Sequence, residues 1–368
     1  VATVVALSEY APPAWLRKNA RAARLPNCRI RLANLPTPLR QWSLPTRALE
    51  YGMADPEIWI KRDDFTGSES SGNKLRKLEF LLAEALRQRC DSVITVGGLQ
   101  SNHCRATAAA AARVGLKSHL ILRTHNDVSK DPGFAGNLLI SRMVGAQLHL
   151  VSRETYESHP EGGWGLCKRL RERLWHERGE RAFAFPSGGS NALGVFGYIE
   201  AIEELRLQLQ SQSMKPFDRI YFACGSGGTA AGLALGMFWS GMMRETDLVA
   251  VGVDDTPDIF YSKIDALWAS MGVIVPGKTS RDLIRIEDGV GAGYALSTPS
   301  ELERIARIAR TTGVLLDPVY SGKATLGMLR DLEGAESILR VLFIHTGGML
   351  GMYDKIGTLA LLPSLRLS

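Results

Sequence analysis

The sequence predicts an α/β protein of two domains, each an open, mostly parallel sheet flanked by helices. Short aliphatic runs alternate with helical stretches in two blocks, one on each side of residue 186. Alternation of strands and helices is typical of parallel sheets. A chain of 368 residues, 45% of them apolar, is long enough for two such domains.

The first block covers residues 75–163. Leucines recur at helical spacing from 75 to 86, and 105–114 is rich in alanine, so both segments are predicted helices. A third helix is expected at 136–144, and the polar stretch 152–163 is expected to be a surface loop. Apolar runs predict strands at 92–96, 119–123 and 147–151.

The second block begins near residue 190. A long helix is expected from Ser190 to about Gln210, with Ser190 or Asn191 as its N-cap. The turn-rich segment 186–189 separates the blocks, which predicts a small domain at 76–191 and a large domain formed by 1–75 and 192–368. Within the large domain, strands are expected at 219–223, 248–253 and 339–344, and helices at 229–237 and 300–310.

Charge and hydropathy narrow the possible partners. The net charge of +6 resides in the first 50 residues, and the other 318 are balanced, so no nucleic-acid surface is expected. No apolar run reaches the roughly 18 residues of a membrane helix, so no membrane partner is expected. The arginine-rich start is either a remnant near an organelle-targeting segment or a basic arm, and both interpretations remain open.

Cysteine and histidine spacing bears on metals and on the compartment. The five cysteines are widely spaced, with no C-x-x-C pair, which indicates neither a zinc site nor a disulfide framework. The seven histidines form no H-x-x-x-H pair, so no metal site is expected. An intracellular, reducing compartment is expected, either an organelle (mitochondrion or plastid) or the cytoplasm.

The strongest local signal is the turn Ala223-Cys-Gly-Ser-Gly-Gly-Thr229, between a predicted strand and a predicted helix. Its glycines let backbone N–H groups converge on an anion, and Ser226 and Thr229 add hydroxyl donors. The turn therefore predicts a phosphate site. It also fits the looser dinucleotide pattern G-x-G-x-x-A, with Asp254 as the acid after the next strand. A tight turn without a ligand is the other interpretation.

Lys74 stands where a predicted helix begins. A lysine at the positive end of a helix is electrostatically misplaced unless its pKa is lowered. A lowered pKa is what an amine nucleophile requires. We expect the cations Arg76 and Lys77 to contribute to that lowering. A solvated lysine beside these two residues is the alternative.

Two further clusters lie at predicted strand ends, where α/β proteins place ligands. Ser101 and Asn102 follow the glycine pair 97–98, and they could cap the next helix or bind a substrate carboxylate. The adjacent His103 is either a packed core histidine or a site residue. The late cluster comprises Tyr294, the segment 316–323 and the segment 345–348, each of which could also be a simple turn.

Together these segments resemble one enzyme family, the D-cysteine desulfhydrases and 1-aminocyclopropane-1-carboxylate (ACC) deaminases. Its members are pyridoxal-phosphate enzymes of the tryptophan-synthase-β fold type, also called PLP fold type II. The likeness runs from about residue 35 to residue 355. The segments that carry it are Lys61-Arg-Asp-Asp64, Ser71-Gly-Asn-Lys-Leu-Arg-Lys-Leu-Glu79, Gly97-Gly-Leu-Gln-Ser-Asn-His-Cys-Arg-Ala106 and Asp317-Pro-Val-Tyr-Ser-Gly-Lys323.

The resemblance implies a role for each matching residue. Lys74 matches the lysine that carries the cofactor, Ser101 the active-site serine, and Asn102 the residue against the cofactor's phenolic oxygen. Tyr294 and Tyr320 match two tyrosines that flank the substrate. The phosphate loop is matched by Gly225, Ser226, Gly227, Gly228 and Thr229. Further contacts are expected from His103 and Ser321 to the substrate and from Thr346 to the cofactor.

Two positions bear on the reaction. The deaminase pattern has Glu and Leu where this chain has Ser321 and Thr346, so the resemblance favours a D-cysteine desulfhydrase. A hydroxyl gives a weaker electron sink than a carboxylate beside the cofactor nitrogen, but one sufficient to eliminate sulfide. The expected reaction converts D-cysteine to hydrogen sulfide, pyruvate and ammonia, with Lys74 or a neighbouring residue taking the α-proton.

Two other functional interpretations remain open. One is an ACC deaminase or a lyase for another β-substituted amino acid, and a more remote one is a nicotinamide dinucleotide-binding oxidoreductase or module. A small amino-acid substrate and a homodimer are expected as partners.

Overall fold

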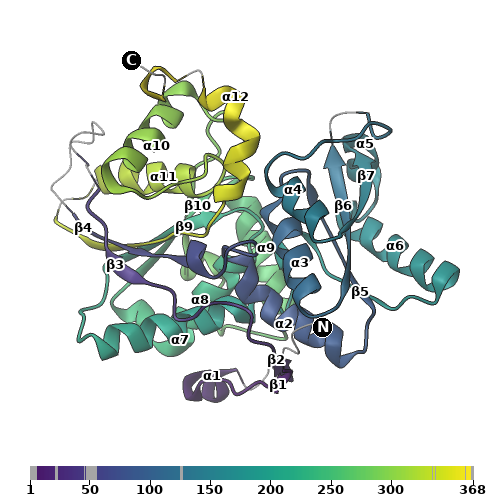
Figure 1. Cartoon of the computed structure of the whole chain (residues 1–368). Coiled ribbons are helices and arrows are strands. Elements are labelled where there is room, and N and C mark those ends of the chain that lie inside the picture. The colour runs from purple at the N-terminus through teal and green to yellow at the C-terminus, as the bar shows by residue number, and fades with distance from the viewer. Residues whose placement is uncertain are drawn as a thin grey trace.

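Two separate β-sheets organise the chain, and Figure 1 shows each with helices packed around it. The computed structural model describes residues 6–20, 24–44, 46, 56–124, 127–333, 335, 337–360 and 362–365. Among these residues the chain order alternates strands and helices through both sheets. The predicted α/β class, with two mostly parallel sheets, is confirmed.

The larger sheet has six strands in the order β11-β10-β9-β12-β4-β3, parallel except for β3 at the edge. Alternate residues of its central strands enter different cores: Ile220 and Phe222 pack under α7, α8 and α9, whereas Tyr221 and Ala223 pack under α10 and α11. The strands are β3 (Leu39–Gln41), β4 (Glu57–Lys61), β9 (Arg219–Cys224), β10 (Asp247–Gly252), β11 (Arg285–Asp288) and β12 (Arg340–Ile344).

The smaller sheet has four parallel strands in the order β7-β6-β5-β8. Leu120 and Leu122 face α3 and α4, and Ile121 faces α6 on the opposite side. Its strands are β5 (Ser92–Gly98), β6 (Lys117–Thr124), β7 (Gln147–Ser152) and β8 (Ala182–Ala184). The strands of both sheets fall inside the predicted domain ranges, and the domain boundaries themselves stay a prediction.

Helices cover both faces of each sheet (Figure 1). Helix α2 packs against α3 on one side and α7 on the other, so it lies between the two sheets. The helices are α1 (Ala14–Asn19), α2 (Lys74–Arg87), α3 (Asn102–Arg113), α4 (Gly136–Met143), α5 (Arg153–Ser158), α6 (Gly162–Arg178), α7 (Phe196–Ser211), α8 (Gly228–Ser240), α9 (Pro257–Ser270), α10 (Pro299–Thr312), α11 (Ser321–Glu333) and α12 (Ile356–Leu359). No helix of the described residues is both long and apolar enough to cross a bilayer.

Two predicted elements are wrong. The segment 152–163 contains helix α5, because the Ser152 hydroxyl caps it by accepting from the Thr155 amide at 3.0 Å. The helix expected from Ser190 begins only at Phe196. Ser190 is not its cap, since its hydroxyl instead lies 2.8 Å from the Ser226 hydroxyl.

The N-terminal segment packs through α1 on helices of the large domain and through β2 (Cys28–Arg29), which pairs with β1 (Ser8–Glu9), on α2. Arg29 forms ion pairs with Glu79 of α2 and Glu200 of α7. That part of the basic stretch is therefore structural. Arg21 and Arg47, also counted in the basic stretch, lie outside the described residues.

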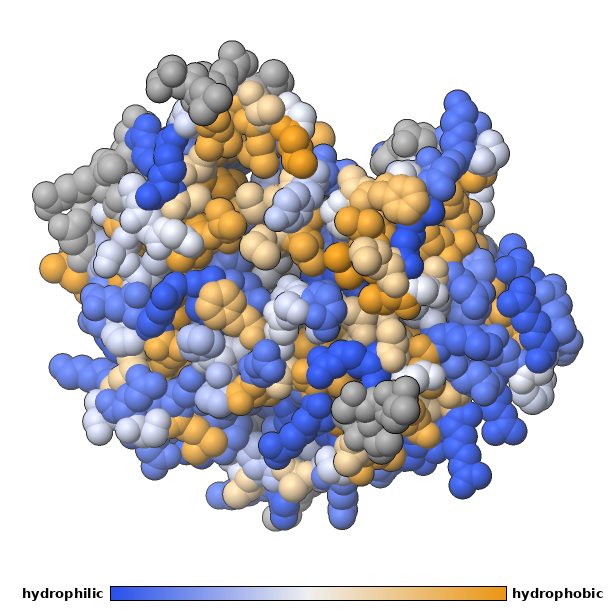
Figure 2. All heavy atoms as spheres, viewed as in Figure 1, coloured by the Kyte–Doolittle hydropathy of each residue, from blue (hydrophilic) through white to orange (hydrophobic). Residues whose placement is uncertain are grey.

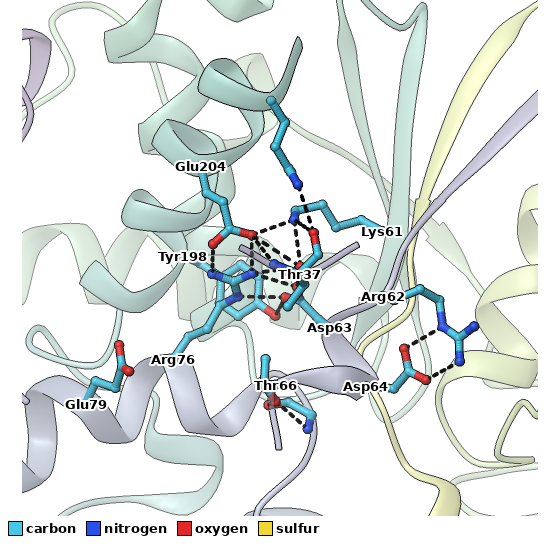
Figure 3. A network of polar contacts seen from close by, with 12 residues as sticks. Thr37, Lys61, Arg62, Asp63, Asp64, Thr66, Arg76, Glu79, Tyr198 and Glu204 are labelled. Atoms are coloured by element: carbon cyan, nitrogen blue, oxygen red, sulfur yellow. Dashed lines mark hydrogen bonds and ion pairs between the residues drawn. The ribbon is translucent and has the colours of Figure 1, made fainter. Parts of the chain in front are cut away.

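A buried ion network fixes the first turn of α2 (Figure 3). The Arg76 guanidinium donates to both Asp63 carboxylate oxygens at 2.8 and 2.9 Å and to both oxygens of Glu204 at 2.9 Å. The Tyr198 hydroxyl also donates to Asp63, at 2.6 Å. Burial alone would raise the pKa of Asp63, but the charge and hydrogen bonds of Arg76 hold it at about 2. The helix start thus depends on paired, buried charges.

We predict that Asp63→Asn lowers the free energy of unfolding by about 3 kcal/mol, because a buried arginine loses half of its counter-charge. The pKa of Asp63 is lower in the folded chain than its ordinary 3.8. Its charge therefore stabilises the fold above about pH 4, and about 2 kcal/mol of stability is lost as the pH falls toward 2. Urea unfolding as a function of pH measures both effects.

The matched control is Glu157→Gln, which breaks the exposed Arg153–Glu157 pair on α5. Exposed pairs contribute little, so this variant should unfold like the wild type. An Asp63→Asn protein as stable as this control would contradict the prediction.

Candidate active site

One cavity lies where the carboxyl ends of strands from both sheets meet. Gly97 and Gly98 of β5 line one wall, and Ala223 and Cys224 of β9 line the opposite one. Ligands of open α/β sheets bind at this kind of edge. The loops after β8, β10 and β12 complete the lining with Ser187, Gly188, Asp254, Thr346, Gly347 and Gly348.

Lys74, the first residue of α2, extends its amine into this cavity. In the described part of the chain the amine has no hydrogen bond or ion pair, and burial lowers the pKa of Lys74 to about 8. The predicted lowering is confirmed, but its expected cause is corrected. The charge of Arg76 is neutralised by Asp63 and Glu204, so burial rather than neighbouring cations is responsible.

Lys77, one turn later on the same face of α2, is a second buried amine. It donates to the Gly188 carbonyl at 3.1 Å and has no carboxylate partner among the described residues. Burial, and then the charge of Lys74, hold its pKa well below the usual value. A Cβ added at Gly228 would lie 2.8 Å from its amine, so this lysine abuts the glycine-rich loop.

The glycine-rich loop is the N-terminus of α8, as predicted. Gly227 is the N-cap with φ of +81°, a left-handed conformation that favours glycine. The cavity is lined by Gly225, Ser226, Gly227 and Thr229, whereas Gly228 lies behind them against Lys77 and Ser190. A helix N-terminus, converging amides and a lysine amine together form a site for a dianion.

The first turn of α3 supplies the residues expected there. Ser101 is the N-cap, and its oxygen accepts from the Cys104 amide at 3.1 Å. The Asn102 amide oxygen accepts from the Asn137 side chain at 3.0 Å. His103 is buried, and all three predicted residues line the cavity. The capping and ligand interpretations of Ser101 are therefore compatible.

The late cluster closes the cavity on the large-domain side. The Tyr294 and Tyr320 hydroxyls lie 2.7 Å apart, and both residues line the cavity, as does Thr346. Ser321 does not line it. The Ser321 hydroxyl donates to the Asp317 carboxylate at 2.7 Å and accepts from the Asp317 amide at 2.9 Å, so it is used within its own turn.

Several residues here were not predicted as site residues. Lys77 carries the signal of i, i+3 spacing from Lys74, which places both amines on one helix face. Ser190 and the segment 187–189 appear in the sequence only as a turn between blocks, and no local pattern points to a ligand. Asn73 is found only from the fold, because its amide group donates to the hydroxyl of Thr229, more than 150 residues away in the sequence, at 3.2 Å.

Comparison with known proteins identifies the family. Residues 30–347 match the family described as "Pyridoxal-phosphate dependent enzyme". The chain is a pyridoxal-phosphate-dependent enzyme. This assignment selects that cofactor over the nicotinamide dinucleotide left open by the glycine-rich turn.

Relatives of this pyridoxal-phosphate enzyme include two with described activities. It is 48% identical over 361 residues to the mitochondrial bifunctional D-cysteine desulfhydrase/ACC deaminase of Arabidopsis thaliana, covering 95% of this chain and 85% of the relative. It is 36% identical to a D-cysteine desulfhydrase of Serratia proteamaculans, covering 87% and 93%. A crystal structure of an ACC deaminase homologue superposes with a TM-score of 0.77 at 32% identity, covering 96% and 100%.

The cavity fits pyridoxal phosphate on its own chemistry. The Lys77 amine, which has no carboxylate partner among the described residues, and the amides at the start of α8 suit a phosphate. The Lys74 amine suits an aldehyde carbon. The described residues hold no group of three His, Cys, Asp or Glu side chains placed to bind a metal ion.

We predict that Gly227→Ala weakens retention of the cofactor. A Cβ at positive φ costs about 1–2 kcal/mol, and relief of this strain would rotate the loop amides away from the phosphate site. The matched control is Gly241→Ala at the other end of α8, where φ is +82° and no side chain is near. Both variants should lose similar thermal stability.

Only Gly227→Ala should release cofactor on dialysis, followed by the visible absorbance of the bound cofactor. Equal retention by both variants would show that the loop is a structural turn.

Proposed function

We propose that this enzyme converts D-cysteine and water to hydrogen sulfide, pyruvate and ammonia. The observation that carries this is a polar cavity in which a basic amine, a serine hydroxyl and a tyrosine pair surround one space, in a chain closely similar to D-cysteine desulfhydrases. Pyridoxal phosphate, when bound, supplies an electron sink for the substrate's α-carbon.

Lys74 is the proposed base. Its pKa of about 8 leaves a useful fraction of free amine near neutral pH, so Nζ can take the α-proton of the substrate. Because the amine is buried without a carboxylate partner, no ion pair holds it in the protonated form. Lys77 and the α8 N-terminus hold the phosphate, so that the cofactor stays fixed while protons move.

The remaining residues orient the substrate and protonate the leaving group. Ser101 donates its hydroxyl proton to the substrate carboxylate, and Asn102 contacts the cofactor. Burial raises the pKa of both Tyr294 and Tyr320, which keeps them protonated. A protonated tyrosine at the cavity can give its proton to the departing sulfide.

The second candidate is ACC deamination, since the Arabidopsis relative is described as carrying both activities. Thr346 lines the cavity, whereas Ser321 is engaged by Asp317 and presents no side chain to it. Thr346 is therefore the residue that distinguishes this pocket from the deaminase pattern at the substrate. A threonine there gives a more polar wall than the leucine that would pack against a cyclopropane ring.

Product assays with D-cysteine, L-cysteine and ACC test the proposal. The holoenzyme should release sulfide and pyruvate in equal amounts from D-cysteine and little ammonia from ACC. The Lys74→Ala variant gives the background level of product release, because it lacks the proposed base. Turnover of ACC without sulfide from D-cysteine would refute the proposed substrate and favour the second candidate.

We predict that Ser101→Ala lowers kcat/KM for D-cysteine by about 10- to 150-fold, the range expected for one hydrogen bond to a charged group. The matched control is Ser152→Ala, because Ser152 caps α5 through the same amide contact outside the cavity. Both variants should lose similar stability. Wild-type kinetics for Ser101→Ala would assign its hydroxyl to helix capping alone.

A homodimer is the proposed assembly. Figure 2 shows apolar side chains gathered where α4 and α12 approach each other. The exposed apolar residues of α4, of α12 and of the segments directly before them are Phe134, Leu139, Met143, Met349, Tyr353 and Ile356. A patch of this kind is typical of an association surface. Sedimentation should give twice the chain mass of 40.2 kDa, and Met143→Glu should lower it toward the monomer.

A reducing organelle, with the mitochondrion first, is the proposed compartment. The Arabidopsis relative is described as mitochondrial. All five cysteines are unpaired in the structure, which suits a reducing environment. Fractionation of cells that express the full-length protein tests this, and recovery with secreted proteins would refute it.

A further inference from the structure

The active-site cavity contains two polar atoms that have no partner among the described residues. One is the Lys74 amine, a donor when protonated. The other is His103 Nδ1, which is buried without a hydrogen bond. Both residues line the same cavity. Because unpaired buried polar atoms are rare and costly, an atom of this kind at a site requires a reason.

The hydrogen bonds around Thr95 fix which ring nitrogen of His103 carries the proton. Thr95 Oγ1 lies 2.9 Å from His103 Nε2 and 3.1 Å from the Phe185 carbonyl oxygen. A carbonyl only accepts, and the threonine hydroxyl has such acceptors in Phe185 and, at 3.4 Å, in Pro186, so we assign it as donating to a carbonyl and accepting from Nε2–H. His103 Nδ1 is therefore a bare acceptor. Burial, followed by the charges of Lys74 and Lys77, holds the pKa of His103 well below its usual value and keeps the ring neutral.

The ring is also held in place. It packs edge-on against Phe185, with ring centroids 5.7 Å apart, and its Cε1 atom would lie 3.3 Å from a Cβ at Gly189. His103 therefore presents a fixed acceptor.

Lys74 is the donor that lacks an acceptor. The Lys77 amine already donates to the Gly188 carbonyl and lies behind the glycine-rich loop. The Lys74 amine faces the open cavity on a flexible four-carbon stem. The charge of Lys74 is the strongest charge acting on His103, which agrees with their proximity.

We propose that His103 is a positioning residue that holds the protonated Lys74 amine through a hydrogen bond from Nζ–H to Nδ1. This rests on the proposed function. The proton passes from the substrate's α-carbon to Nζ, and the amine becomes an ammonium. One N–H of that ammonium is shared with Nδ1 without transfer, so the histidine stays neutral. The acceptor stabilises the ammonium and makes Lys74 a better base.

The matched test uses two amide substitutions. His103→Asn retains an oxygen acceptor at the Nδ1 position, whereas His103→Gln retains a donor toward Thr95 but has no acceptor at Nδ1. The reaction followed is exchange of the α-proton of D-alanine in D₂O by the holoenzyme, measured by NMR across pH. D-alanine has no leaving group, so this readout is independent of sulfide release.

His103→Gln should slow exchange by about tenfold or more, the loss typical of a hydrogen bond to a charged group, and its acid limb should move to lower pH. His103→Asn should retain most of the exchange rate, and the acid limb of its pH profile should stay at the wild-type pH. The other titratable groups facing this space are Lys77, Cys224, Asp254, Tyr294 and Tyr320. Lys77 also has a lowered pKa and could shape the pH profile. Because Lys77 is the same in both variants, the test is the difference in exchange rate between His103→Gln and His103→Asn.

A second readout uses the protein without substrate. Histidine ¹⁵N shifts should show His103 protonated at Nε2 and bare at Nδ1, with the signal assigned by its loss in His103→Gln. Equal rates for the two variants, a proton on Nδ1, or no exchange by the wild type would each overturn the proposal. Exchange that depends on His103 in a protein that releases no sulfide would instead refute D-cysteine as the substrate and leave the role of His103 standing.

Discussion

The salt bridge between Arg76 and Asp63 holds the helix turn on which the active site is built. Arg76 points away from the cavity into a network with Glu204, while Lys74 and Lys77 of the same turn point toward it. Asn73, the residue before the helix, makes no side-chain cap, so the position of this turn depends on the network. Two lysines can then be held at the positive end of a helix, where their charge is disfavoured.

That arrangement gives the cavity an excess of positive potential. The Lys74 amine and the N-termini of three helices, α2, α3 and α8, meet at one space. The Lys77 amine lies behind the glycine-rich loop, and the Asp254 carboxylate is also part of the lining. An anion balances this charge, and phosphate does so with three oxygens at once. Burial at this site favours the neutral form of Lys74 and so its use as a base.

Local patterns predict the strands and the glycine-rich turn because these depend on neighbours in sequence. The role of Lys77 is harder to predict, because it depends on contacts with Gly188 and Gly228, which are more than a hundred residues away in the sequence. Helix α6 goes unpredicted, although Leu166, Leu170 and Leu174 recur every four residues on its buried side. For Ser321 the sequence motif predicts too much. The motif indicates a ligand contact, whereas in the folded chain the Ser321 hydroxyl donates to Asp317.

The cavity lining comes from both sheets and from positions between residues 71 and 348. No fragment confined to either sheet contains the whole binding surface, so the cofactor has high affinity only for the completely folded chain. Ligand that binds the native state alone adds about 2.7 kcal/mol of stability at a free concentration one hundred times its Kd. Supply of the cofactor therefore sets how long the chain survives proteolysis in the cell, as well as how fast it turns over substrate.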